Sequence, residues 1–221
     1  QILSLKKRPD PALIKEFSSF GVALITDAMD RYGAMLGILP VVRGMKIAGP
    51  AITVQTYRAD NLMVHVGLHL AQAGDILVVD AGGITSTGVW GGHMTDMALI
   101  KKLGGIVVDG AIRDSAEMIT KGFSAFCKAV SPMGGHKDDP GSVNIAIGCA
   151  NVVVNAGDII IGDDDGVAVI PQNRIDEVMA RCRKIKENEI KQEKAMSEGK
   201  ELFDLIGLSK QLDALGLKLP E

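Results

Sequence analysis

An arginine followed directly by an aspartate, Arg113-Asp114, is the pair in this sequence best suited to chemistry. An arginine offers a planar fork of N–H donors for a carboxylate. A neighbouring aspartate offers oxygen to a hard cation such as Mg²⁺, which is bound through one or two carboxylates and keeps several waters. One dipeptide can therefore hold both a substrate and a metal ion, although the same two residues also make an ordinary surface ion pair.

A glycine-rich loop, Gly88-Val89-Trp90-Gly91-Gly92-His93-Met94, precedes the pair and opens a predicted helix. Glycines let backbone N–H groups approach a ligand closely, and the N-terminus of a helix favours negative charge. A small anion, either a carboxylate or a phosphate, fits such a loop. The loop matches neither GxGxxG nor GxxxxGK[ST], which argues against nucleotide binding.

The elements that must position these residues form a βαβ unit. A strand over 76–79 leads into the loop 80–92, a helix over 92–103 and a second strand over 106–109, followed by the turn that carries Arg113-Asp114. Ligands of such units collect beyond the carboxyl ends of the strands. The glycine-rich loop and Arg113-Asp114 are therefore expected to face one pocket.

The rest of the chain predicts an α/β fold, because short β-branched runs alternate with helical periodicity. Most predicted strands are too apolar for a wet face, so we expect the sheet to be covered on both sides. The remaining predicted strands are 46–48, 51–57, 125–130, 152–154, 159–162 and 167–170, and the remaining helices are 13–32, with a break near Gly21, and 61–73.

A charged helix is predicted after Pro171, over residues 174–199, with 7 Lys or Arg and 6 Asp or Glu. Its apolar stripe turns polar at Glu189. The second half of the helix is either simply solvated or brings Glu189 against a neighbouring subunit. The chain thus divides into an α/β domain over 1–171 and a helical extension over 172–221.

Composition limits the partners. The 221 residues are 47% hydrophobic and 23% charged, with 24 Lys or Arg against 27 Asp or Glu, a net charge of −3. This balance lacks the basic excess of nucleic-acid-binding proteins, and no apolar run approaches the roughly 20 residues that span a bilayer. No secretory signal is seen at the start, and the three cysteines form no CxxC pair. We expect a cytoplasmic protein without nucleic-acid or membrane partners.

Four segments of the chain resemble the RraA-like family, which includes the 4-hydroxy-4-methyl-2-oxoglutarate / 4-carboxy-4-hydroxy-2-oxoadipate aldolases. The similarity covers about residues 20–171 and continues into the C-terminal helix of the aldolase branch. The segments are Gly74-Asp75-Ile76-Leu77-Val78-Val79-Asp80, Gly105-Ile106-Val107-Val108-Asp109-Gly110-Ala111-Ile112-Arg113-Asp114, Gly141-Ser142-Val143-Asn144 and residues 157–167.

The resemblance implies an α/β fold with a layered, swivelling β/β/α-like core and an added C-terminal helix. It implies an aldolase that uses Mg²⁺ or Mn²⁺, cleaves 4-hydroxy-2-oxo acids to pyruvate, and often decarboxylates oxaloacetate. Such enzymes assemble as trimers or hexamers with sites between subunits. The C-terminal extension is then expected to pack on a neighbouring subunit.

The resemblance also assigns roles to individual residues. Arg113 matches the substrate-binding arginine, and Asp114 matches the aspartate that ligates the metal. The stretch Gly91-Gly92-His93-Met94 matches the loop whose backbone N–H groups hold the pyruvyl group. Glu189 matches a glutamate that the adjacent subunit contributes near the waters of the metal, which favours the intersubunit interpretation of the polar break in the helix.

One position departs from the aldolase pattern. The aldolases carry an aspartate followed by twenty residues and then Arg-Asp, and the corresponding position here is Gly92. That aspartate helps in proton transfer, so its loss bears on the substrate or the protonation step more than on the pyruvyl site. His93 is a candidate base, because imidazole titrates near neutral pH. It could equally be a histidine that only hydrogen-bonds the loop.

Two other functions stay open at this point. A non-catalytic family member would bind and regulate a ribonuclease assembly, and the glycine at position 92 is compatible with a lyase or decarboxylase for a different 2-oxo acid. His65 and His69, four residues apart on a predicted helix, favour packing over a metal pair because no third ligand accompanies them. The loop 136–139 either is solvated or borders the pocket, and Asp163-Asp164-Asp165-Gly166 is predicted to be a turn.

Overall fold

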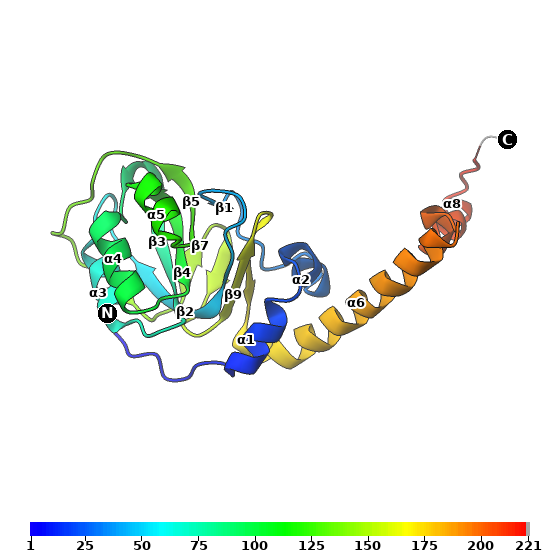
Figure 1. The fold of residues 1–221 in the computed structure, drawn as a ribbon, viewed down its shortest axis with the longest axis horizontal. Helices are drawn as coiled ribbons and strands as arrows, with labels where there is room; N and C mark the ends of the chain where they lie inside the picture. The colour runs from blue at the N-terminus through cyan, green and yellow to red at the C-terminus, as the bar shows by residue number, and fades with distance from the viewer. Residues whose placement is uncertain (220–221) are drawn as a thin grey trace.

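The computed structural model describes residues 1–219 as a mixed α/β fold (Figure 1). The helices are α1 (Pro11–Phe17), α2 (Val22–Ala28), α3 (Leu62–Leu70), α4 (Gly92–Ile100), α5 (Ser115–Lys121), the 3₁₀ helix η1 (Gln172–Arg174), α6 (Ile175–Ser197), α7 (Leu202–Leu205) and α8 (Leu208–Ala214). The strands are β1 (Leu39–Pro40), β2 (Ile47–Gln55), β3 (Ile76–Gly88), β4 (Gly105–Ile112), β5 (Ala125–Val130), β6 (Ser142–Val143), β7 (Ile147–Cys149), β8 (Val152–Val154), β9 (Ile159–Asp163) and β10 (Gly166–Ile170).

The main sheet runs in the order β1-β5-β4-β3-β2-β9-β10, with β6 paired to β2. Strands β2 to β5 are parallel, whereas β1, β6, β9 and β10 pair antiparallel to their neighbours. Strand β2 pairs with β9 over its first residues and with β3 over its last, so the mixed sheet curls until it is nearly closed. The carboxyl ends of β3 and β4 lie at one edge.

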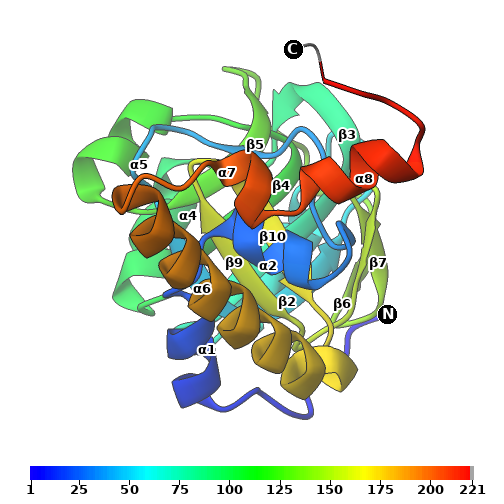
Figure 2. The same ribbon diagram turned by 90° about the vertical axis from the view of Figure 1, so that its right-hand side faces the viewer.

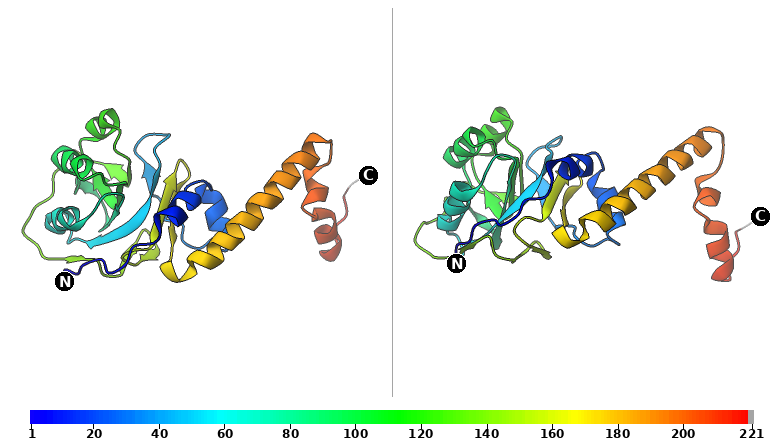
Figure 3. Two further views of the ribbon diagram at one scale, coloured as in Figure 1. Left: turned by 60° about the horizontal axis from the view of Figure 1, so that its bottom comes forward. Right: turned by 90° about the horizontal axis from the view of Figure 1, so that it is seen from below.

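Helices cover the sheet from two sides (Figure 3). Helices α3, α4 and α5 bury their apolar side chains on the outer face of the parallel strands. A second apolar cluster fills the space between the parallel strands, β9–β10 and the β7–β8 hairpin. Helices α1, α2 and the first half of α6 pack on β9 and β10, and Figure 2 shows α6 crossing in front of them. The predicted α/β class is confirmed.

Strand β4 explains why the pattern predicted a sheet covered on both faces. All of its residues are buried, and alternate side chains enter different apolar clusters, Ile106 and Val108 on the helical side and Val107 on the other. Neither face of the strand touches water, so no polar alternation is needed.

Some boundaries differ from the sequence prediction. Residues 80–88, expected as a loop, continue β3, and the strand absorbs its glycines through register shifts against β4, with Gly82 and Gly83 at positive φ. The strands expected over 46–48 and 51–57 form one strand, β2. The helix expected over 13–32 is broken near Gly21, as predicted, and its second part, α2, ends at Ala28. Helix α5 and strands β1, β6 and β7 were not predicted, since each is too short to show a period.

The C-terminal extension leaves the α/β body along α6, and α7 and α8 follow at its far end (Figure 1). Val178, Met179 and Cys182, on the first half of α6, are its buried residues. Beyond them the helix is exposed or half-exposed, as its polar stripe predicts. None of the helices within residues 1–219 has the length and apolar character needed to cross a membrane.

Candidate active site

Arg113 follows the last residue of β4, beside the loop that leaves β3. Gly88 pairs with Ala111, the N–H of Val89 donates to the carbonyl of Ala111 at 3.0 Å, and the N–H of Arg113 donates to the carbonyl of Trp90 at 2.9 Å. These backbone bonds draw the glycine-rich loop along the end of the neighbouring strand. The two features that the sequence predicted to share a pocket therefore lie side by side.

Asp114 has a left-handed backbone, with φ 58° and ψ 35°, a conformation that aspartate tolerates better than most residues. It stands at the N-cap of α5, yet its carboxylate makes no cap bond to that helix. Instead Oδ2 accepts a hydrogen bond from the N–H of Gly92 at 2.8 Å and lies 3.5 Å from Nε of Arg113. The strained turn thus directs the carboxylate across to α4.

Side chains of the Arg113 turn and of α5 lie over Gly91 and Gly92. A Cβ at position 91 would stand 2.8 Å from Oδ2 of Asp114 and 2.9 Å from Nε of Arg113. A Cβ at position 92 would stand 2.7 Å from Oε2 of Glu117. A side chain in either place would require the end of Asp114, Arg113 or Glu117 to shift.

The first turn of α4 presents donors to this site. A helix leaves the N–H groups of its first residues without intrahelical acceptors. That of Gly92 is taken by Asp114, so those of His93 and Met94 remain for a ligand. Trp90, fully buried and stacked on Phe123 with ring centroids 5.9 Å apart, fixes the start of the helix by donating Nε1–H to the hydroxyl of Thr95 at 2.9 Å.

A cavity of about 140 Å³ lies at this point. Its lining combines the predicted residues with three from elsewhere in the chain: Asn61, His65, Trp90, Gly91, Gly92, His93, Met94, Arg113 and Lys137. The chain therefore gathers Arg113 and the loop Gly91-Gly92-His93-Met94 around one small space. Asp114 does not line it but contacts two of its residues, Gly92 and Arg113.

The charge of the cavity wall suits an anion. Arg113 and Lys137 contribute cations beside the N-terminus of α4. Burial, reinforced by the ammonium of Lys137, lowers the pKa of His65, so this imidazole is neutral at physiological pH. His93 is exposed, lines the cavity, and makes no side-chain hydrogen bond within residues 1–219.

Glu117 is a functional candidate that the sequence reasoning missed. Its carboxylate occupies the space beside Gly92. Gly92 is the position at which the aldolase pattern has an aspartate and this chain has none. It also accepts a hydrogen bond from Nζ of Lys121 at 3.1 Å, and the same Nζ donates to Oδ1 of Asp96 at 2.6 Å. The sequence carried only a weak signal for it, because Glu117 lies on a helix of seven residues and Asp114 precedes that helix with a left-handed backbone.

The donor set fits a hard divalent cation. Asp114 and Glu117 are half-exposed carboxylates whose oxygens flank the same two glycines. Mg²⁺ and Mn²⁺ favour carboxylate oxygen and water, and Mg²⁺ is commonly held by only one or two carboxylates. In the part of the chain that the structure describes, no three His, Cys, Asp or Glu residues form a metal cage. A cation here would rely on water and substrate for its other ligands.

Glu189 does not join the other predicted residues within one chain. It stands on the half of α6 that projects from the body (Figure 1), and its carboxylate accepts from Nζ of Lys186 at 3.1 Å. His65 and His69 line a neighbouring cavity between α3 and α4, and no third metal ligand joins them within residues 1–219. Asp163-Asp164-Asp165-Gly166 joins β9 to β10, the turn that was predicted.

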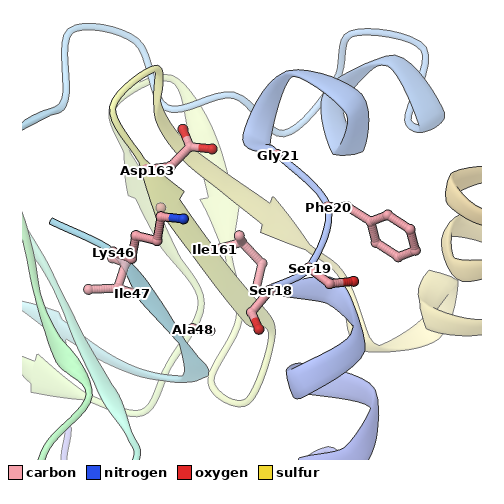
Figure 4. Close-up of a pocket in the computed structure, with 10 residues that line it drawn as sticks. Ser18, Ser19, Phe20, Gly21, Lys46, Ile47, Ala48, Ile161 and Asp163 are labelled. Atoms are coloured by element: carbon pink, nitrogen blue, oxygen red, sulfur yellow. The ribbon is translucent and has the colours of Figure 1, made fainter. Parts of the chain in front are cut away.

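A larger cavity, of about 350 Å³, opens at the other end of the parallel strands (Figure 4). It lies between the α1–α2 connection, the start of β2 and the end of β9, and Ser18, Lys46 and Asp163 border it. One oxygen of Asp163 accepts from the N–H of Val22 at 2.9 Å and the other from the N–H of Asp165 at 3.0 Å. This carboxylate is thus already engaged in the fold.

Known proteins match the chain over most of its length. Residues 22–169 match the RraA-like family model, described as Aldolase/RraA. A protein of Halalkalibacterium halodurans, provisionally named a 4-hydroxy-4-methyl-2-oxoglutarate aldolase, is 33% identical over 84% of this chain and 89% of its own.

Two solved structures share the fold. One is an uncharacterized protein from Pseudomonas syringae pv. tomato, with a TM-score of 0.80 and 25% identity over 90% of this chain and 98% of that one. The other is Streptomyces coelicolor RraAS2, described as an unusual member of the RNase ES inhibitor RraA protein family. Its TM-score is 0.72, with 26% identity over 83% of this chain and 96% of that one.

Proposed function

This chain belongs to the RraA-like family, and we propose that it is a divalent-metal-dependent aldolase that cleaves 4-hydroxy-2-oxo acids to pyruvate and also decarboxylates oxaloacetate. The observation that carries the proposal is the convergence of Arg113 and the N-terminus of α4 on one cavity, with the carboxylate of Asp114 in contact with both. The name of the H. halodurans relative supports 4-hydroxy-4-methyl-2-oxoglutarate as the substrate type.

The cation would be held by Asp114, with Glu117 beside it. When bound, Mg²⁺ or Mn²⁺ would act as a Lewis acid toward the 2-oxo group of the substrate. Arg113 binds carboxylate oxygen of the pyruvyl unit through its planar fork. The N–H groups of His93 and Met94 stabilise the negative charge that develops on the pyruvyl oxygen as the carbon–carbon bond breaks, which is electrostatic stabilisation by preorganised donors.

The two reactions differ in one proton. In the aldol cleavage, the 4-hydroxyl proton leaves, the C3–C4 bond breaks, its electron pair enters the pyruvate enolate, and a second oxo compound departs. In the decarboxylation of oxaloacetate, the C3–C4 bond breaks, its electron pair enters the same enolate, and carbon dioxide departs without removal of a hydroxyl proton. In both reactions the enolate then takes up a proton at C3 to give pyruvate. Glu117 occupies the space beside Gly92 and His93 borders the same cavity, so these two are the candidates for the base.

We further propose that the site is completed in a homo-oligomer, a trimer or a hexamer, in which residues 172–221 pack on a neighbouring copy. Two features of the extension support this. Glu189 lies away from the cavity of its own chain, and the segment after α6 exposes large apolar side chains that a partner surface would cover, namely Leu202, Ile206, Leu215, Leu217 and Leu219.

A second candidate is a non-catalytic regulator that binds a ribonuclease assembly. The similarity to S. coelicolor RraAS2 favours it. The Arg113-Asp114 pair, and the carboxylate that fills the place beside Gly92, favour the enzyme. A lyase or decarboxylase for a different 2-oxo acid would use the same groups.

Pyruvate release discriminates among these functions. Metal-stripped protein is incubated with oxaloacetate or with 4-hydroxy-4-methyl-2-oxoglutarate, with and without Mg²⁺ or Mn²⁺, and pyruvate is followed by a coupled dehydrogenase. We expect release from both substrates only when metal is added. Release from neither, with both metals tested, would refute the assignment to these substrates and favour the regulator.

A further inference from the structure

A buried aspartate that the proposed chemistry does not use, Asp60, precedes Asn61, a residue of the cavity wall. Asp60 has no exposed surface. One of its oxygens accepts from the N–H of Leu62 at 2.7 Å, and the other accepts from the N–H groups of Asp138 at 2.7 Å and Asp139 at 3.1 Å. A single carboxylate thus joins the start of α3 to a loop more than seventy residues away in the sequence.

Asp60 is ionised in the folded protein. Burial opposes the charge, but the three backbone N–H donors, together with nearby His136, outweigh it and hold the pKa of Asp60 below its ordinary value. A carboxylate that receives this many donors is a strong point of attachment.

The loop that Asp60 holds, residues 131–139, connects the end of β5 toward β6. It is fastened at other points as well. The N–H of His136 donates to the carbonyl of Ala59 at 2.9 Å, the N–H of Asn61 donates to the carbonyl of His136 at 2.8 Å, and the N–H of Gly88 donates to the carbonyl of Met133 at 2.7 Å. The loop therefore bridges the start of α3 and the end of β3.

The same loop contacts the substrate-binding arginine. A Cβ at Gly134 would stand 2.6 Å from Nη1 of Arg113, so the guanidinium lies against the loop backbone. Lys137, from the same loop, lines the cavity. Asn61, next to Asp60, lines it too, with a buried Oδ1 that has no hydrogen-bond partner within residues 1–219. A shift of the loop would move the ammonium of Lys137 and free the fork of Arg113.

We propose that Asp60 is a positioning residue for the reaction: its carboxylate holds loop 131–139 in the place that fixes Arg113 and Lys137 around the cavity. The inference rests on the proposed function, because it assigns to these two cations the binding of an anionic 2-oxo acid. Asp60 itself touches no substrate.

A matched control separates positioning from plain stability. Asp158 is also buried, at 2% exposure, and its carboxylate also accepts backbone N–H groups, from Asn155 at 2.8 Å and Gln172 at 3.0 Å. It stands in the turn before β9 and does not line the cavity. Asp158→Asn therefore removes a similar network without disturbing Arg113.

The test compares Asp60→Asn with Asp158→Asn in the full-length protein. Thermal unfolding reports stability, steady-state decarboxylation of oxaloacetate with Mg²⁺ gives kcat and KM, and the fluorescence of the single tryptophan, Trp90, reports pyruvate binding in the presence of Mg²⁺. We expect both variants to lower Tm. Only Asp60→Asn should raise KM by about tenfold or more with a smaller change in kcat, the sign of lost binding, and weaken pyruvate binding in parallel.

Gly134→Ala keeps the inference testable if Asp60→Asn fails to fold. It leaves Asp60 intact but forces the guanidinium of Arg113 away from the loop, so it should raise KM in the same way. An unchanged KM and unchanged pyruvate binding in whichever of the two variants folds would overturn this inference alone, as would equal effects of Asp60→Asn and Asp158→Asn on KM. A wild-type protein that neither binds nor releases pyruvate would overturn the proposed function and this inference with it.

Discussion

The two ends of the parallel strands each carry a cavity, and we propose that the smaller one is the active site. At the amino ends, the cavity of about 350 Å³ is bordered by Lys46 and by an aspartate already bonded to two backbone N–H groups. At the carboxyl ends, the cavity of about 140 Å³ gathers Arg113, Lys137, a helix N-terminus and, beside them, Asp114. Volume alone therefore does not mark a functional site; convergent charges and donors do.

The difference follows from the connections at the two edges. In parallel βαβ units the turns that follow the carboxyl ends are where helices begin, so backbone N–H groups and strand-end side chains point to one place. The amino-end cavity lies instead near β9, which runs antiparallel to β2.

The largest effect is expected at Asp114. Asp114→Asn keeps the preference for the left-handed backbone but loses the charge that would hold a cation. Metal-dependent release of pyruvate should fall by at least about a hundredfold, as losses of transition-state electrostatics do, while circular dichroism and Tm stay near wild type. Undiminished turnover would contradict the assignment of the cation to Asp114.

The next effect should separate the two reactions. Glu117→Gln removes the carboxylate beside Gly92, so cleavage of 4-hydroxy-4-methyl-2-oxoglutarate should fall about a hundredfold, a usual size for general-base help, and more than oxaloacetate decarboxylation does.

Asp96→Asn is the matched control for Glu117, because it removes the other partner of Lys121 and leaves Glu117 in place. It should change neither reaction. If both reactions fall equally in Glu117→Gln, the glutamate serves the cation alone, and His93→Ala becomes the variant in which cleavage should be lost selectively.

Replacement of Arg113, the proposed substrate-binding arginine, should have a smaller but clear effect. Arg113→Lys keeps the charge and loses the planar fork, so kcat/KM should fall by about tenfold or more, roughly 1.4 kcal/mol for each factor of ten. Kinetics indistinguishable from wild type would show that Arg113 acts only as a surface cation paired with Asp114.

The C-terminal extension is tested by subunit mixing. Glu189→Gln should lower activity with little effect on assembly, and mixed oligomers of Glu189→Gln and Asp114→Asn should regain a part of the wild-type activity, because some sites then contain both native residues. Size-exclusion chromatography verifies that the subunits exchange. Subunit exchange without recovery of activity would show that Glu189 does not contribute to a site in a neighbouring subunit.

No effect is expected at the opposite end of the strands. Lys46→Ala alters the wall of the larger cavity (Figure 4) and should leave kcat and KM within about twofold of wild type, as is usual for a substitution remote from the site. A pronounced loss of activity would move a functional role to that cavity.

The sequence predicted the parts of the site that are local in the chain. The loop before α4 and the Arg113-Asp114 turn follow two adjacent strands, so their meeting is fixed by the βαβ connection alone. Glu117 was missed because α5 has only seven residues and no visible period. Asn61, Lys137 and Asp60 meet through a long-range contact between α3 and loop 131–139, and no periodicity in one sequence reports which loops touch.

For the C-terminal extension, the sequence predicted the helix but not what the helix contacts. Its charge pattern predicted α6 nearly to its ends, because a long helix repeats its signal over many turns. The partner of Glu189 is not encoded in that pattern. The role of Glu189 across a subunit boundary therefore stays a prediction.

A crystal structure with Mg²⁺ and pyruvate would show where both ligands bind. We expect a cation on the carboxylate of Asp114 and a pyruvate carboxylate on the guanidinium of Arg113, in the carboxyl-end cavity. Pyruvate bound without contact to Arg113 and Asp114, or seated in the cavity beside Lys46, would contradict it.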